Sequence, residues 1–328
     1  MNMAKMDAEP LIEGVSKPAS QLALGTAFYN IDSKDKWFDI LDDYVKFGGT
    51  IIDTARGYST SEEVLGLWTE DRSTRDQIII VTKCGLTGDG ILPTDRFPEL
   101  VSEELTTSLQ TLRTDYIDVY MLHRDNHMTP VAEILEPLNS EMINGRIHAL
   151  GASNWEYRRV TEANEYAYKH GLRGFAIVSN NLSLAVPSAS FYPGLVSADE
   201  AGERWHEETG IPLVPWSSQA RGFFTGRYIP QMRNGHVPVS ADVDGFTRRM
   251  IEVYRTDENL ERLARAEELG KKKGGYTAVE VALAWLLHKP FSIVPIVGPH
   301  TREELTSCIK ATSLSLTEWE IRCLDLEV

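Results

Sequence analysis

The sequence predicts an α/β protein, a single-domain (β/α)8 (TIM) barrel that occupies residues 1–328. Eight short runs rich in Ile, Val and Leu alternate with about eight stretches of helical periodicity. The runs are apolar throughout, as expected of parallel strands buried on both faces. A doubly wound sheet is the competing fold, but the residues after the first run, Gly25 to Tyr29, lack the glycine pattern of a dinucleotide-binding turn.

Each apolar run is long enough for one barrel strand and is bounded by polar or turn-forming residues. The expected strands are Leu22–Ala27, Thr50–Thr54, Gln77–Lys83, Tyr116–His123, Ile147–Ser153, Phe175–Asn180, Ile211–Ser217 and Ser292–Gly298. Apolar residues at three- and four-residue spacing between them predict helices, as in Trp37 to Val45 and Leu100 to Leu112. Glycines follow several of these stretches, where they are typical of helix ends.

Three segments depart from a minimal barrel. We expect residues 1–20 to form a peripheral or poorly ordered N-terminal segment. The segment from about Gln219 to Asp257, after the seventh strand, is too long for an ordinary loop. Long loops are usually functional or disordered, and this position in barrels is often used to bind phosphate. A shorter loop rich in Pro and Ser follows the sixth strand, over Ala185 to Gly194.

Composition excludes several classes of function. The formal net charge of −15 argues against a nucleic-acid partner, which requires clustered Lys and Arg. No apolar stretch approaches a membrane span, so we expect no membrane partner. The three cysteines are far apart and the histidines lack metal-ligand spacing, so we expect no metal site. Unpaired thiols favour a reducing compartment, and we expect a cytoplasmic protein.

Four polar residues stand at or just after the ends of three successive strands. They are Asp53, Tyr58, Lys83 and His123. The carboxyl ends of parallel barrel strands converge on one face, so these side chains are expected to meet there. Taken singly, each has a structural explanation: a packing Tyr, a turn-capping Asp, a core His. Lys83 is harder to explain in this way, because a lysine beside an apolar strand needs a partner.

Together the four residues supply the parts of a carbonyl reduction. Hydride must come from a cofactor, because no side chain donates one. Tyr58 would donate the proton, and a nearby Lys83 ammonium would lower the pKa of the phenol. Asp53 would hold the lysine charged and in place. His123 would donate a hydrogen bond that orients the carbonyl oxygen.

From about Leu22 to Ile309 the chain resembles the aldo-keto reductase family. The matching segments occur in the family's order. They are Ile52–Tyr58, Thr82–Lys83, Leu122–Asp125, Gly151–Trp155, Val214–Ser217, Val294–Gly298 and Thr301–Leu305. The resemblance implies a barrel that binds an extended nicotinamide cofactor without a Rossmann motif. It also implies the roles stated above for Tyr58, Lys83, Asp53 and His123.

The resemblance further implies the residues that bind the cofactor. Ser153 and Asn154 would hold the carboxamide, Trp216 would stack on the nicotinamide ring, and Ser217 would approach the pyrophosphate. The long loop after the seventh strand would partly cover the cofactor.

Several positions differ from the commoner family pattern. Asn180 stands where the family usually has Gln, and Gly298 stands where many NADP-selective members have Lys. Glu304 replaces the usual Arg or Gln and would suit a free ribose hydroxyl better than a phosphate. His300 and Arg302 could compensate. The resemblance favours NADP(H), and NAD(H) stays open.

The residues expected to line the substrate pocket are Phe28, Tyr29, Arg56, Arg124 and Asp125. Their aromatic and charged character indicates a small-molecule substrate, a polar, sugar-like carbonyl compound. Alternatively, Arg124 and Asp125 form a structural ion pair.

The leading hypothesis is therefore an NAD(P)(H)-dependent oxidoreductase that reduces an aldehyde or ketone, or runs in reverse. The alternatives are a cofactor-binding sensor module with little turnover, and a lyase or isomerase that uses Lys83 as a Schiff-base nucleophile. The sequence does not indicate an oligomeric state.

Overall fold

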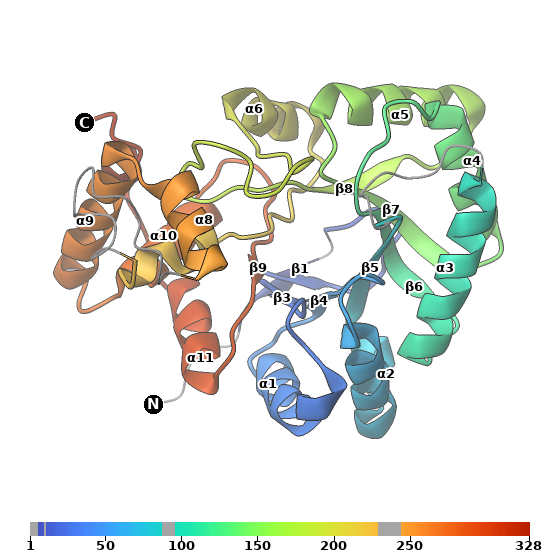
Figure 1. Cartoon of the computed structure of the whole chain (residues 1–328), viewed down its shortest axis with the longest axis horizontal. Helices are drawn as coiled ribbons and strands as arrows, with labels where there is room; N and C mark the ends of the chain where they lie inside the picture. The colour runs from blue at the N-terminus through green and yellow to red at the C-terminus, as the bar shows by residue number, and fades with distance from the viewer. Residues whose placement is uncertain (1–5, 10, 87–95, 229–243) are drawn as a thin grey trace.

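A parallel sheet of seven strands forms the centre of the computed structural model, which describes residues 6–9, 11–86, 96–228 and 244–328 (Figure 1). The sheet runs in the order β8-β7-β6-β5-β4-β3-β9. The strands are β3 (Ala23–Gly25), β4 (Ile51–Asp53), β5 (Ile79–Cys84), β6 (Ile117–Leu122), β7 (Ile147–Ser153), β8 (Phe175–Ser179) and β9 (Ile296–Val297). From β3 to β8, strands consecutive in sequence are neighbours in the sheet, so the order never reverses as it does in a doubly wound fold.

Single-residue bridges join the two edges of this sheet. Leu213 pairs in parallel with Val178 of β8 on one side and with Ile293, just before β9, on the other. The strand expected at Ile211–Ser217 is reduced to this bridge because Pro212 and Pro215 have no N–H to donate to a ladder. Their carbonyl groups still accept hydrogen bonds: the Pro212 carbonyl accepts from the Val178 N–H at 3.1 Å, and the Pro215 carbonyl accepts from the Ile296 N–H at 3.0 Å. The sheet therefore closes, and the predicted (β/α)8 barrel is confirmed.

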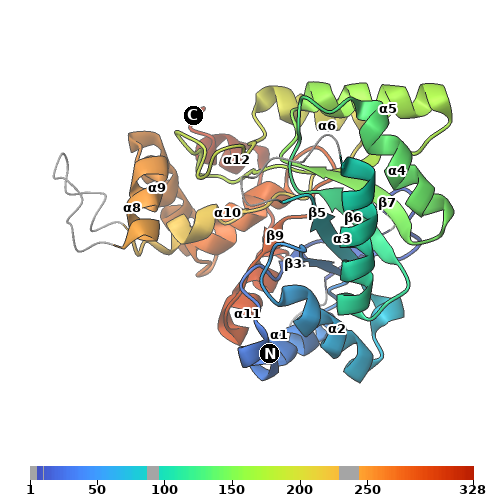
Figure 2. The same cartoon turned by 45° about the vertical axis from the view of Figure 1, so that its right-hand side comes forward.

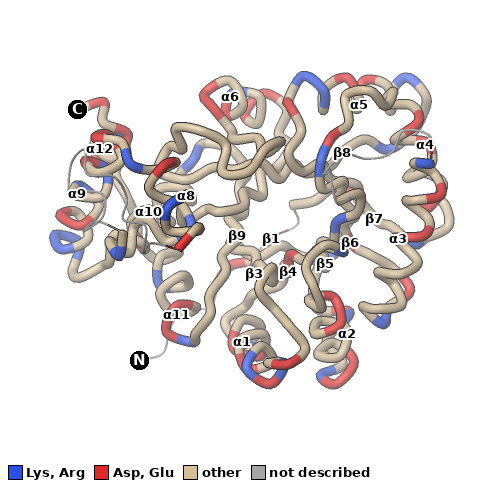
Figure 3. Tube along the Cα trace, viewed as in Figure 1, with Lys and Arg blue, Asp and Glu red and all other residues tan. Residues whose placement is uncertain are grey.

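Helices surround the barrel (Figures 1 and 2). The helices that follow barrel strands are α1 (Lys34–Lys46), α2 (Ser61–Arg72), α3 (Phe97–Leu112), α4 (Val131–Ile143), α5 (Tyr157–His170), α6 (Glu200–Thr209), α10 (Ala278–Leu287) and α11 (Arg302–Ala311). Three more, α8 (Gly245–Tyr254), α9 (Asp257–Lys272) and α12 (Glu318–Leu324), gather with α10 on one side. Acidic and basic residues are interspersed along the outer helices and sparse on the strands (Figure 3). Among the described helices, none combines the length and apolar character needed to cross a bilayer.

The barrel interior is filled by one apolar cluster. Its strand members occupy alternate positions, and we call it the inner cluster. It comprises Ile12, Val15, Ala19, Ala23, Ile51, Ile79, Val81, Val119, Met121, Ala149, Ile177, Val214 and Val294. The first three belong to the N-terminal segment, which we expected to be peripheral. In its described part, β1 (Ala8–Glu9) pairs antiparallel with β2 (Ala19–Ser20), and the residues between them pack on the amino end of the barrel.

The long segment after the seventh strand contains two helices in its described part. The 3-10 helix η3 (Ala220–Thr225) comes first, and α8 ends the segment. The polar stretch between them, residues 229–243, lies outside the described part of the chain. The prediction that this loop covers a cofactor concerns the same residues and so lies outside the described part as well.

A buried charge cluster stabilises the amino end of the barrel. Asp118 of β6 is fully buried and lies 2.7 Å from Lys17 Nζ and 2.8 Å from an Arg75 guanidinium nitrogen. Its second oxygen accepts from the Ile80 backbone N–H at 2.9 Å. Lys17 also donates to the Ile78 carbonyl at 2.7 Å, so one carboxylate ties the N-terminal segment to two strands.

We predict that Asp118→Ala lowers the free energy of unfolding by about 3–5 kcal/mol, because two cations lose their carboxylate in a desolvated site. Chemical denaturation monitored by circular dichroism measures this change. Asp115→Ala, an exposed position just before the same strand, is the matched control and should change stability by less than about 0.5 kcal/mol. Equal effects of the two substitutions would show that the buried cluster does not stabilise the fold.

Candidate active site

Six polar or aromatic residues end the barrel strands on the inner face. Each stands two or four positions after a member of the inner cluster, and side chains alternate along a strand, so all six point into the mouth of the barrel. They are Asp53, Lys83, His123, Ser153, Ser179 and Trp216. The structure thus brings together the strand-end residues that the sequence predicted, and it adds Ser179.

A buried ion pair lies at the centre of this group. Lys83 Nζ is 2.5 Å from Asp53 Oδ1 and donates to the Thr54 carbonyl at 2.8 Å. Both side chains are almost fully buried. Burial by itself lowers the pKa of Lys83, but the charges of Asp53 and Tyr58 outweigh it and the net pKa is raised. Lys83 is therefore an ammonium at neutral pH.

Tyr58 lies beside this ion pair, in the turn between β4 and α2. Lys83 Nζ is 5.1 Å from the centre of the Tyr58 ring. Burial raises the pKa of the phenol, and the Lys83 charge opposes that shift without reversing it. From the sequence we expected a lowered pKa for this phenol. That expectation is corrected, because desolvation of the phenolate outweighs the neighbouring ammonium.

His123 faces Tyr58 across the mouth of the barrel. The two ring centres are 5.5 Å apart and the planes are inclined by 81°. Burial, with the nearby charges of Lys83 and Arg124, lowers the pKa of His123 to about 3. The imidazole is therefore neutral at physiological pH and can donate one hydrogen bond.

Ser153 and Asn154 at the end of β7 form a compact hydrogen-bond network. Ser153 Oγ donates to the Ser179 carbonyl at 3.0 Å, and Asn154 Nδ2 donates to Ser153 Oγ at 3.1 Å and to the His123 carbonyl at 3.2 Å. Asn154 has a left-handed φ of 59°, which costs free energy and is tolerated best by Asn and Gly. The network fixes these two polar groups next to His123.

Asn180 does not join this group. Its amide donates to the Trp155 carbonyl at 2.8 Å and accepts from the Trp155 N–H at 3.2 Å, on the outer side of the strand. The expected cofactor contact of Asn180 is corrected to a structural contact. Ser179, one position earlier, faces inward, and its buried Oγ has no hydrogen-bond partner among the described residues. The sequence signal that could have identified Ser179 is the alternation of side chains along the strand, which places Ser179 on the same inner face as Ile177.

Trp216 and Ser217 follow the bridge at Leu213. Trp216 is partly buried, and no described residue forms a hydrogen bond with its Nε1. Ser217 has a left-handed φ of 52°, and Ala220 and Arg221 repeat this conformation at 46° and 53°. Such strained backbone is concentrated at functional sites, where it turns N–H groups toward a ligand.

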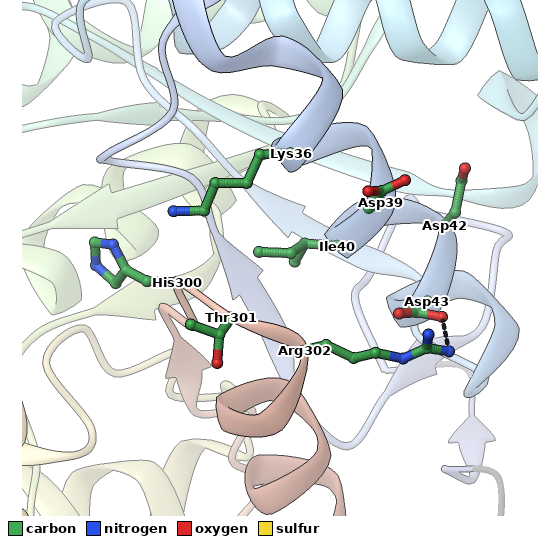
Figure 4. A pocket seen from close by; sticks show the side chains of 8 residues that line it. All are labelled: Lys36, Asp39, Ile40, Asp42, Asp43, His300, Thr301 and Arg302. Carbon is green, nitrogen blue, oxygen red and sulfur yellow. Dashed lines mark hydrogen bonds and ion pairs between the residues drawn. The ribbon is translucent and has the colours of Figure 1, made fainter.

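His300 and Arg302, two of the residues predicted for the adenosine end, line a pocket of about 490 Å³ between α1 and the start of α11 (Figure 4). Lys36 reaches toward His300, and Arg302 lies 2.8 Å from Asp43. Asp39 and Asp42 line the same pocket. The pocket therefore offers cations and carboxylates together.

Glu304 and Gly298 lie at the same end of the molecule. The Glu304 carboxylate accepts from the His300 backbone N–H at 2.6 Å, ahead of α11. A Cβ built on Gly298 would meet nothing within 4 Å, so this position offers open space.

Two of the predicted substrate residues lie near this second pocket. Phe28 is 62% exposed, and its ring centre is 4.9 Å from that of His300. Tyr29 is buried and stacks on Trp37 with ring centres 4.3 Å apart. The structure therefore assigns Tyr29 to the outer core, and we correct its expected substrate contact.

The other predicted substrate residues differ in their partners. Arg56 pairs at 2.9 Å with buried Glu62. Asp125 lies 3.4 Å from Arg159 and 3.3 Å from His127. Arg124 does not pair with Asp125 and instead donates to the Pro193 carbonyl. The alternative of an Arg124–Asp125 ion pair is thus not found.

The site fits a polar organic ligand. At the mouth, His123 Nδ1, Ser179 Oγ and Trp216 Nε1 are buried without hydrogen-bond partners among the residues that the structure describes. Buried polar atoms of this kind normally find a partner, and a bound ligand can supply it. Among the described residues, no group of three or more His, Cys, Asp or Glu is arranged to hold a metal ion.

We predict that Asn180→Ala lowers the free energy of unfolding by about 1–3 kcal/mol, because it leaves two buried backbone groups of Trp155 without partners. Ser179→Ala is the matched control on the neighbouring position, and it should leave stability nearly unchanged because its hydroxyl has no partner to lose. Urea denaturation of both variants measures the difference. An Asn180→Ala variant with an unchanged free energy of unfolding would show that the two hydrogen bonds of Asn180 are dispensable.

Comparison with known proteins agrees with this geometry. Residues 21–326 match the model of the aldo/keto reductase family. Norsolorinic acid reductase B of Dothistroma septosporum is 29% identical over 97% of this chain and 80% of its own length. A probable aryl-alcohol dehydrogenase of Saccharomyces cerevisiae is 26% identical over 89% of this chain and 88% of its own. The NADP(+) aryl-alcohol dehydrogenase of Phanerodontia chrysosporium is 26% identical over 89% of this chain and 76% of its own length.

The family match covers nearly the whole barrel, and the relatives with functional names are oxidoreductases. The chain therefore belongs to the aldo/keto reductase family and is an NAD(P)-dependent oxidoreductase.

Proposed function

We propose that this protein reduces an aldehyde or ketone to the alcohol, or catalyses the reverse reaction, with Tyr58 as general acid and base. The observation that supports this is the buried Asp53–Lys83 ion pair set against the Tyr58 ring in the mouth of the barrel. A phenol whose pKa is raised keeps its proton at neutral pH, and the adjacent ammonium stabilises the phenolate that forms after the transfer. Asp53 keeps the ammonium in position.

The nicotinamide cofactor supplies the hydride when it is bound. Ser153 and Asn154 would hold its carboxamide, with Ser179 as a further hydroxyl at that place. Trp216 would cover the ring, and the backbone after Ser217 would face the pyrophosphate. Neutral His123 would donate a hydrogen bond to the substrate oxygen and so orient it toward Tyr58.

The substrate that we propose is an aromatic carbonyl compound rather than a sugar-like one. The Trp216, Phe191 and Tyr192 rings gather around the Arg221 guanidinium beside the site. Aromatic side chains favour flat apolar ligands. Two relatives are named for aryl alcohols, which agrees with this assignment.

The alternative functions receive less support. A sensor module would not need an ion pair beside a proton donor, and all four proposed catalytic residues lie together. A Schiff-base mechanism requires a neutral amine, whereas the pKa of Lys83 is raised. Cys84, Cys308 and Cys323 are all unpaired, which supports the proposed cytoplasmic location.

For the cofactor we propose NADP(H), with Arg302 and His300 at the adenosine phosphate. The 2.8 Å pair between Arg302 and Asp43 opposes this binding, because the carboxylate neutralises the guanidinium and repels a phosphate. Binding of NADP(H) would therefore displace Asp43 from Arg302. NAD(H) would leave the pair intact.

We predict that Tyr58→Phe lowers kcat/KM for reduction of aromatic aldehydes by about 100- to 10,000-fold, because the proton donor is lost. Steady-state assays of dihydronicotinamide absorbance measure this effect. Tyr168→Phe is the control, since that tyrosine is 88% exposed on α5. A Tyr58→Phe protein that reduces aldehydes at the parent rate would exclude Tyr58 as the acid.

We predict that Asp43→Asn lowers the KM for NADPH by about threefold to tenfold, because Arg302 is released for the phosphate. The KM for NADH should stay unchanged, and Arg302→Ala should raise the KM for NADPH alone. Asp35→Asn, on the exposed face of the same helix, is the control. Equal effects of Asp43→Asn on both cofactors would contradict the phosphate role of Arg302.

A further inference from the structure

Arg221 holds a guanidinium group among aromatic rings next to the proposed active site. It lies in η3, four residues after Ser217, with a left-handed φ of 53°. Its guanidinium carbon is 4.2 Å from the centre of the Phe191 ring and 5.8 Å from the centres of both Tyr192 and Trp216. Two segments distant in sequence, the loop after β8 and the turn after Trp216, thus meet on this side chain.

No acidic residue in the described part of the chain forms an ion pair with Arg221. Its Nε is buried and has no hydrogen-bond partner within the described part of the chain. The protein has 48 acidic and 33 basic side chains, so carboxylates are plentiful. Arg302 is paired with Asp43, whereas the described neighbours of the Arg221 guanidinium are aromatic rings. A desolvated guanidinium without a carboxylate is unfavourable, and such departures are expected where a ligand completes the site.

Arg221 is also coupled to the proposed reaction centre. Its charge contributes to the titration of the Tyr58 phenol, and Tyr58 contributes in turn to that of Arg221. Trp216, which it flanks, points inward from the seventh strand. The guanidinium therefore lies near the proton donor and toward the loop of Phe191 and Tyr192.

Arg124 adds a second cation at the same place. It directly follows His123, and its charge contributes to the lowered pKa of that imidazole. Its Nη1 donates to the Pro193 carbonyl, while its Nε is buried and has no partner in the part of the chain that the structure describes. Among the described acidic residues, none pairs with Arg124. Two guanidinium groups without carboxylates thus contact the loop over residues 191–193, close to Tyr58 and His123.

We propose that Arg221 is a specificity-determining residue, which binds the carboxylate of a substrate that carries both a carboxylate and a reducible carbonyl group. Arg forms paired hydrogen bonds with a carboxylate in one plane, and the neighbouring rings would cover the carbon skeleton. Arg124 strengthens the positive potential there. The inference rests on the proposed function, because it names the substrate class of the same site.

Turnover of a matched pair of aldehydes tests the proposal. The substrates are 4-carboxybenzaldehyde and 4-formylbenzamide, which differ mainly in charge. The proteins are the wild type, Arg221→Gln, Arg221→Lys, and Arg248→Gln as a control that removes an exposed arginine of α8. The wild type should prefer the carboxylate by at least about tenfold in kcat/KM.

Arg221→Gln should abolish that preference by raising the KM for 4-carboxybenzaldehyde. The same variant should change kcat/KM for the neutral amide by less than about threefold. Arg221→Lys should retain part of the preference, and Arg248→Gln all of it. Affinity for NADPH and NADH should be unchanged. A large loss of cofactor affinity in Arg221→Gln would assign the guanidinium to the cofactor and overturn the proposal.

Direct binding separates this inference from the proposed function. Benzoate and benzamide are titrated into the wild type and Arg221→Gln by calorimetry, which requires no turnover. Benzoate should bind the variant at least about tenfold more weakly, with benzamide unaffected. Equal benzoate affinity in the two folded proteins overturns the carboxylate site, even if aldehydes are reduced. If the wild type binds benzoate more tightly than Arg221→Gln does but reduces no aldehyde, the proposed function is overturned and the carboxylate site stands.

Discussion

The ion pair between Lys83 and Asp53 is the constraint on which the site depends. Two charges at 2.5 Å in a nearly solvent-free position are stable only while each keeps the other. The barrel enforces this pairing, since Asp53 is in register with Val81 of the adjacent parallel strand β5, and Lys83 stands two residues beyond Val81 on the same inner face. The phenol of Tyr58 is then placed against a cation that cannot move away. The proton transfer that we propose for Tyr58 therefore depends on the geometry of two neighbouring strands.

The mouth of the barrel is formed by backbone that departs from regular structure. The seventh strand is reduced by its two prolines, and left-handed residues follow at Ser217 and Arg221. Asn154 adopts the same conformation at the end of β7. The closed sheet supplies the stability that such positions need. The rigid part of the barrel and the strained part are therefore adjacent, and the polar side chains lie where they meet.

Charge is distributed in a way that separates the two ends of the proposed cofactor site. At the adenosine end, Arg302 is already paired with Asp43, and other carboxylates line the same pocket. At the reaction end, Arg221 and Arg124 have no such partners among the described residues. A protein with a net charge of −15 therefore places two partly buried arginines without a carboxylate partner among the described residues beside the proposed proton donor. An anionic group on the substrate would be drawn to that end.

Much of the fold and part of the site were predictable from sequence, because apolar runs report burial on both faces and the polar residues after them report strand ends. Asp53, Lys83 and His123 were located in this way. Side-chain direction was not located from the sequence, because a shift of one position along a strand reverses the face: Ser179 points inward and Asn180 points outward. Tyr29 and Trp37 became a stacked pair only through packing. The raised pKa of Tyr58 and the carboxylate-free surroundings of Arg221 also arise in three dimensions, because desolvation and proximity depend on segments far apart in the chain.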